Sequence, residues 1–176
     1  APMNVGTTGR RIYIGKLAGT SVFDPLGEKV GVIHDVVVTF RLNSTANVIG
    51  FVVEVGPRKR VFLPFTRVTA IESGSVITTG LLNIRSFNQR PVETLVITEL
   101  FDREVTMNDG SGVVKILDVA MQQRRPRDWI ISTLHVQRVR TTTLGFKRGG
   151  TTMTVRVDEV SSLLKTDSNQ AATALI

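Results

Sequence analysis

Few residues of this sequence could carry acid–base or metal chemistry, and most of them stand far apart. The two histidines are His34 and His135, and only His34 has an acidic neighbour, Asp35. A metal site needs several converging ligands, and a catalytic histidine needs a nucleophile and an orienting group. Beyond Asp35, neither histidine has an acid or a second histidine at a ligand spacing, and no convincing catalytic constellation stands out. We therefore interpret both histidines as partly buried strand residues, and we predict a non-enzymatic chain with no catalytic residue, cofactor or metal site.

Asp35 and Asp118 hold the same place in two similar stretches, 83 residues apart. An aspartate at such a place could bind a cation or a partner. It could instead have a structural role, in which it accepts hydrogen bonds from a neighbouring turn or pairs with a nearby cation inside the fold. Recurrence in two copies with otherwise different surfaces favours the structural role.

The best candidates for a binding site are three basic clusters, each expected at a turn or loop. They are Arg58, Lys59 and Arg60; Arg124, Arg125 and Arg127; and Lys147 and Arg148. If they contacted phosphates, binding would weaken steeply with salt. A solvated basic surface is the interpretation we favour. Aromatic residues are only 6% of the chain, whereas a protein that binds single-stranded nucleic acid needs exposed aromatic rings. We interpret Trp129 as a residue of the hydrophobic core or of the packing between two small barrels, which are predicted below.

The composition is that of an ordinary globular protein with a basic balance. The 176 residues include 41% hydrophobic residues, no cysteine, and a net charge of +7. The charge makes a nucleic-acid partner conceivable without establishing one. Disulfides are excluded, which fits a cytoplasmic location. No segment approaches the roughly 18 consecutive apolar residues of a membrane helix, so we expect no membrane insertion.

A stretch similar to Leu17–Val38 recurs once, at Leu100–Met121. The identical pairs are Leu17/Leu100, Val22/Val105, Gly27/Gly110, Val30/Val113, Ile33/Ile116, Asp35/Asp118 and Val36/Val119. A repeat of this length predicts two small units that pack on each other.

Short apolar runs and frequent turn residues predict an all-β fold of two small antiparallel barrels in tandem, with short 3-10 or helical turns. One helical turn is expected at Phe65–Arg67 and a short helix at Asp158–Leu163. The predicted divisions are a flexible leader at 1–11, a first barrel at 12–77, an ordered strap at 78–94, a second barrel at 95–165, and a tail at 166–176 that could begin a helical domain.

Several motifs together resemble the PRC-barrel family, which occurs in the reaction-centre H subunit and the ribosome maturation factor RimM. They are Lys16–Gly19, Asp24–Gly27, Val30–Val38 and Phe62–Phe65. With Arg67–Glu72, Val76–Arg85 and Arg124–Trp129, the tandem copy resembles the N-terminal part of bacterial proteins in which two PRC-barrels precede MgtE-type intracellular and CBS domains. The resemblance covers roughly residues 12–165 and makes both predicted barrels PRC-type.

The resemblance implies a non-enzymatic protein-interaction or regulatory module of a larger protein linked to magnesium transport or sensing. Its partner would be another domain of the same protein or another protein. No magnesium site is carried over, because the resemblance does not include the helical domain that would hold one. The alternative is an RNA- or ribosome-associated module, which the basic charge favours. Edge strands also invite pairing with a second copy, so a homodimer stays open.

Overall fold

A computed structural model describes residues 10–40, 46–81, 84–141, 144–145, 147–161 and 163. Most of these residues lie in strands, which confirms the all-β prediction. The predicted tail at 166–176 lies outside the described residues, as do the first nine residues of the predicted leader. The strands are β1 (Arg11–Tyr13), β2 (Ser21–Phe23), β3 (Lys29–Phe40), β4 (Ala46–Glu54), β5 (Arg60–Pro64), β6 (Val68–Glu72), β7 (Ser75–Thr78), β8 (Glu93–Leu95), β9 (Glu104–Met107), β10 (Val113–Arg125), β11 (Asp128–Thr141), β12 (Lys147–Arg156) and β13 (Val160–Ser161).

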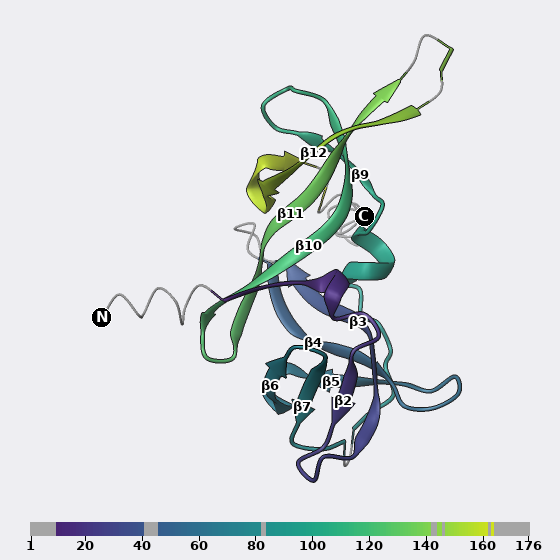
Figure 1. The fold of residues 1–176 in the computed structure, drawn as a ribbon, viewed down its shortest axis with the longest axis vertical. Coiled ribbons are helices and arrows are strands. Elements are labelled where there is room, and N and C mark those ends of the chain that lie inside the picture. Colours follow the sequence, from purple (N-terminus) through teal and green to yellow (C-terminus); the bar gives the residue numbers. More distant parts are fainter. Residues whose placement is uncertain are drawn as a thin grey trace, which may run out of the picture.

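Among the described residues, all thirteen strands belong to one sheet, whose main path runs β13-β9-β10-β11-β4-β3-β2-β7-β6. The strands β2–β7 form the first half of the molecule and β9–β13 the second half, and the two halves lie at opposite ends of its long axis (Figure 1). The sheet is not closed, so the prediction of two separate barrels is not confirmed. The halves are joined edge to edge where Ile130 of β11 pairs with Asn47 of β4.

The turns that start the two long strands β3 and β10 are built alike, as the repeat predicts. Asp24 Oδ1 accepts hydrogen bonds from the backbone N–H groups of Leu26 and Glu28, both at 2.9 Å. Gly27 follows with φ of 84°, a conformation that favours glycine. In the second half, the equivalent Gly110 has φ of 80°. These turns fix the register in which each long strand enters the sheet.

In the described ranges, short helical turns lie at four places: η1 (Ile14–Lys16), η2 (Phe65–Arg67), η3 (Val96–Leu100) and η4 (Val157–Glu159). The helical turn predicted at Phe65–Arg67 is confirmed by η2. The helix predicted at Asp158–Leu163 is wrong, because η4 is a single turn and Val160–Ser161 continues as β13. Pairing of Val160 with Met107 of β9 buries the valine, which a solvated helix would not do.

The leading segment of each half pairs with the other half. β1 lies antiparallel to β10, with Ile12 opposite Met121. At the corresponding place in the repeat, β8 lies antiparallel to β3, with Leu95 opposite Val37. Each half therefore supplies a strand and the following helical turn to its partner. β1 includes Arg11, so the last residues of the predicted leader are part of the folded structure.

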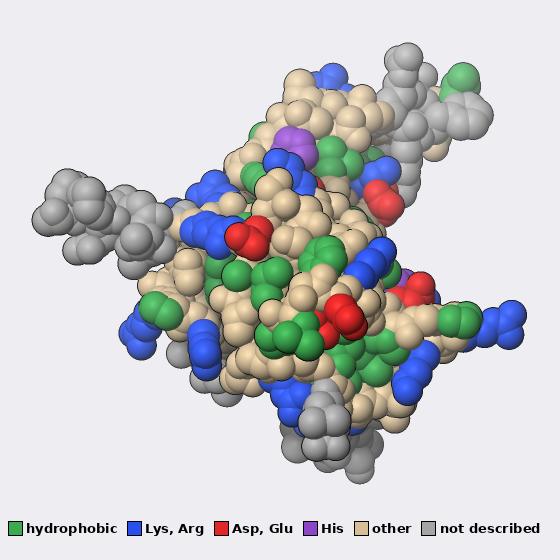
Figure 2. All heavy atoms as spheres, turned by 60° about the horizontal axis from the view of Figure 1, so that its bottom comes forward, with side chains coloured by type: hydrophobic (Ala, Val, Ile, Leu, Met, Phe, Trp, Pro, Cys, Tyr) green, Lys and Arg blue, Asp and Glu red, His purple; other side chains and the backbone are tan. Residues whose placement is uncertain are grey.

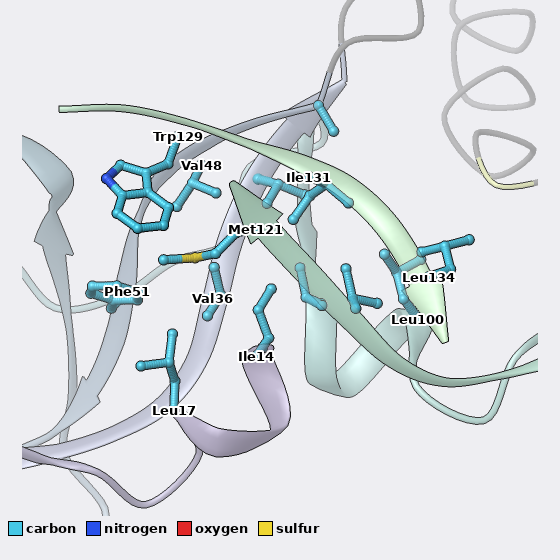
Figure 3. Close-up of a cluster of buried hydrophobic side chains, with 14 of the residues drawn as sticks. Ile14, Leu17, Val36, Val48, Phe51, Leu100, Met121, Trp129, Ile131 and Leu134 are labelled. Carbon is cyan, nitrogen blue, oxygen red and sulfur yellow. The ribbon is translucent and has the colours of Figure 1, made fainter. Parts of the chain in front are cut away.

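One hydrophobic core runs through both halves. Ile14, Phe51, Met121 and Trp129 belong to a single cluster of buried side chains, and Figure 3 shows them side by side with residues from β3, β10 and β11. The ring of Trp129 lies 6.2 Å from that of Phe65. Trp129 is thus packed between the halves, as the sequence predicted.

The connection at 78–94 is ordered where it is described, and it lies on the first half. Ser86 bridges to Val61 of β5, and Phe87 N–H donates to the Arg60 carbonyl at 2.9 Å. A second, smaller cluster forms beneath this strap, where Phe62 and Phe87 pack on the face of β3–β4–β5 that points away from the main core. None of the helical turns in the described ranges is long or apolar enough to cross a membrane.

Candidate binding surface

Asp35 is a buried connector between the two halves. Its side chain is 0% exposed. Its carboxylate accepts hydrogen bonds from Val36 N–H (2.8 Å), from Ile97 N–H (2.7 Å), and from both the backbone N–H and the hydroxyl of Thr98 (2.9 and 2.7 Å). Ile97 and Thr98 belong to η3, which leads into the second half. The carboxylate is therefore occupied by a turn, as the structural interpretation predicted.

Asp118 makes the equivalent contact from the second half, to the helical turn η1 that leads into the first half. Its Oδ1 accepts Gly15 N–H of η1 at 2.9 Å and Val119 N–H at 2.8 Å. A Cβ at Gly15 would lie only 2.7 Å from the second carboxylate oxygen, so a larger residue here would have to displace the Asp118 side chain. Thr98 stands at the corresponding place in η3 and contributes its hydroxyl instead. The two aspartates hold the exchanged segments and are not open ligand sites.

The two histidines lie on strands, and Asp109 lies at a turn. His34 and His135 are half-buried on β3 and β11, as predicted. The pKa of Asp109 is below its usual value because the Ser111 side chain and backbone N–H donate to it, at an exposed turn. In the part of the chain that the structure describes, no group of three or more His, Asp or Glu residues could hold a metal ion.

The first basic cluster borders an open hollow of about 470 Å³ beside the strap. We call it the strap hollow; its lining residues are Arg58, Lys59, Arg60, Ser86 and Phe87. Ser86 and Phe87 were not among the predicted site residues. The pattern of apolar residues in the connection indicated an ordered strap, but it did not indicate which strand the strap would join.

The second basic cluster lies at the tip of the β10–β11 hairpin, beside the junction of the halves. Arg124 forms an ion pair with Asp128 at 3.3 Å. Arg127 occupies the turn with φ of 65° and lines a hollow of about 210 Å³ together with Trp129 and Arg10. The guanidinium of Arg10 lies 5.9 Å from the Trp129 ring and donates a hydrogen bond to the Ile71 carbonyl.

A second hollow, of about 330 Å³, is lined by residues of β1 and shares Ile71 with the first. Arg11, Tyr13 and Lys16 line it, opposite Glu72 of the β6–β7 hairpin. We call the two hollows together the junction groove. Arg10 and Arg11 were missed by sequence reasoning, because they fall in the predicted flexible leader.

The third basic cluster is not in a loop, which corrects the prediction. Lys147 and Arg148 lie on β12, paired with Thr141 and Arg140 of β11, since the hairpin strands extend further than expected. The side chains of Lys147 and Arg148 lie outside the described residues. The clusters thus occupy different parts of the molecule, and on one face Figure 2 shows Lys and Arg side chains around exposed hydrophobic ones.

Comparison with protein families separates the two halves. Residues 9–81 match the PRC-barrel domain. Residues 94–166 match a different family, described as the Actinomycetes SH3 domain. The PRC-barrel resemblance of the first half is therefore confirmed, whereas the second half, predicted as another PRC-type barrel, matches an SH3 domain. No curated protein matches the chain. Neither family description mentions MgtE-type or CBS proteins, so that narrower resemblance remains a prediction.

Proposed function

We infer that this chain is a non-enzymatic interaction module that binds an acidic segment of a partner protein in the junction groove, between the PRC-barrel half and the SH3-type half. The observation that carries the proposal is the composition of the groove. Arg10, Arg11, Lys16 and Arg127 line its two hollows, against one acid, Glu72. Charge complementarity of this kind selects acidic partners and speeds their association.

Largely buried apolar side chains form the floor of the groove. Phe65, Val68, Ile71 and Trp129 line the hollow that holds Arg127. An aromatic residue next to arginine in a packed hollow is the arrangement that carries binding energy at many protein interfaces. A short acidic segment could place carboxylates on the rim and an apolar side chain against this lining.

Replacing Arg127 with glycine tests the groove with little risk to the fold, because glycine readily adopts the φ of 65° found there. We expect the variant to bind an acidic peptide of alternating Glu and Val about tenfold more weakly than the native chain does, through the loss of charge-assisted hydrogen bonds. Trp129 is the only tryptophan, so its fluorescence reports binding at this place.

Arg140→Gly is the matched control, since it removes the same charge from an exposed position on β11 of the SH3-type half. Its binding should equal that of the native chain. Equal weakening by both variants would mean that the peptide senses only net charge, and no change in Trp129 fluorescence would place binding outside the groove. Either result would contradict the proposal.

Two narrower parts of the proposal rest on sequence alone. A cytoplasmic location fits a chain without cysteine. Membership in a larger MgtE-type protein with CBS domains, linked to magnesium transport or sensing, is supported by the motif resemblance. The coding sequence after Ile176 tests it: CBS domains there would support the proposal, and an unrelated continuation would contradict it.

A further inference from the structure

We propose that the strap hollow binds single-stranded nucleic acid, with backbone phosphates on Arg58, Lys59 and Arg60 and one base on the ring of Phe87. This site is distinct from the junction groove and does not depend on a protein partner. Its volume of about 470 Å³ lies within the range of sites that hold one small ligand, about 300–1,000 Å³, so one nucleotide would fill it.

The backbone fixes the three cations at the mouth of the hollow. The turn between β4 and β5 is closed by Val55 N–H donating to the Lys59 carbonyl at 3.0 Å, and by Lys59 N–H donating to the Gly56 carbonyl at 3.4 Å. Arg58 adopts φ of 63° within it. That conformation is costly for a residue with a side chain, and it places a guanidinium where glycine would fit at lower energy.

The positive charge of the hollow is largely uncompensated. Among the described residues, no acidic side chain lines it. Arg60 has an ion pair with Glu54 at 3.5 Å, but the side chains are 51% and 39% exposed, so this contact contributes little and can rearrange. Within the described ranges, no ion pair involves Arg58 or Lys59. Two or three cations are therefore available to phosphates.

The strap adds a fixed aromatic surface to these cations. Its residues lie antiparallel beside β5 through the isolated bridge between Ser86 and Val61. Phe62 N–H donates to the Arg85 carbonyl at 3.1 Å, and Phe87 N–H donates to the Arg60 carbonyl at 2.9 Å. The Phe87 ring packs against Phe62, with 6.3 Å between centroids, and is only half-buried. The Arg85 guanidinium stands 4.9 Å from the centroid of the Phe62 ring.

The combination favours nucleic acid over an acidic peptide. An acidic peptide would use the cations, but it would contact the Phe87 ring only where it also carries an apolar side chain next to its carboxylates. A nucleotide carries both a phosphate and a flat base, and bases stack on aromatic side chains largely without regard to sequence. Because no other strand closes the hollow in the described residues, its open shape suits a flexible single strand better than a rigid duplex.

Fluorescence anisotropy with a labelled ten-residue uridine oligonucleotide across a salt series measures the phosphate contacts. For three contacts, the logarithm of the affinity should fall with the logarithm of salt with a slope of about −2. Lys59→Ala should reduce the magnitude of that slope by about 0.7. Arg140→Ala, which removes the same charge from β11, should leave the slope unchanged. A slope that changes equally in both variants would overturn the site.

Phe87→Leu separates base recognition from general anion binding, since leucine keeps an apolar contact with Phe62. It should weaken oligonucleotide binding about tenfold while leaving the affinity for inorganic polyphosphate unchanged. Matching unfolding curves for native and variant chains would confirm that the fold is intact. Unaltered oligonucleotide binding by Phe87→Leu, or equal weakening of polyglutamate binding and oligonucleotide binding by Lys59→Ala, would show that the hollow is only a general anion surface and would overturn the proposal. A parallel series with a thymidine oligonucleotide shows whether the sugar is read as well.

Discussion

Asp35→Ala is expected to lower the free energy of unfolding by about 3–5 kcal/mol, because several buried hydrogen-bond donors lose their acceptor at once. The backbone N–H groups of Val36, Ile97 and Thr98 all donate to this carboxylate, as does the Thr98 hydroxyl. The free energy of unfolding of a small domain is typically about 5–15 kcal/mol, so the variant should be close to unfolding. Urea denaturation followed by Trp129 fluorescence measures the loss.

Asp118→Ala is the matched control for this change, because it removes the equivalent carboxylate from the second half. Asp118 is only half-buried, and its carboxylate accepts hydrogen bonds from the N–H groups of Gly15 and Val119. Water can accept some of the hydrogen bonds that these N–H groups lose. We therefore expect the free energy of unfolding to fall by about 1–2 kcal/mol. Equal losses in the two variants would contradict the view that burial and the Thr98 contacts make Asp35 the stronger connector.

The sequence predicts the equivalence of these aspartates but not which turn each one holds. A repeat shows that two segments adopt similar structures, and the turn residues around Asp24 and Gly27 indicate where the long strands begin. Whether Ile12 pairs with its own half or with β10 depends on contacts across about a hundred residues, which local patterns do not encode. For the same reason, the turn signals were compatible with two closed barrels, whereas the strands form one open sheet.

Some of the candidate binding residues could be placed from the sequence, and others only from the fold. Runs of basic residues next to turn residues place Arg58 and Arg127 at hairpin tips directly from the sequence. Phe87 and Arg10 enter the hollows only because a strap lies on β5 and a leading segment lies on the junction. The strap's apolar residues indicated order, but Arg10 precedes the first strand in a polar stretch, where no periodic pattern marks it as fixed.

Ile14→Ala tests whether the exchanged segments make the two halves one folding unit. Ile14 belongs to η1, which precedes the first half, yet it is fully buried in the cluster that contains Met121 and Leu134 of the second half (Figure 3). Loss of a buried isoleucine side chain costs about 2–5 kcal/mol. For a chain of this size, a loss of about 3 kcal/mol should lower the melting temperature by about 6–12 °C.

Ile97 is the counterpart of Ile14 in η3 and is only partly buried against the same cluster, so Ile97→Ala should have a smaller effect. The decisive measurement is the number of thermal unfolding transitions that each of two signals shows. Trp129 fluorescence reports the junction, and far-ultraviolet circular dichroism reports strands throughout the sheet. In Ile14→Ala both signals should change together at the lowered temperature, because β1, β8 and the shared core link every strand. If the circular dichroism signal instead separated into two transitions, with one at the native temperature, the PRC-barrel half and the SH3-type half would fold independently, and the exchanged segments would be a contact between domains rather than part of a common core.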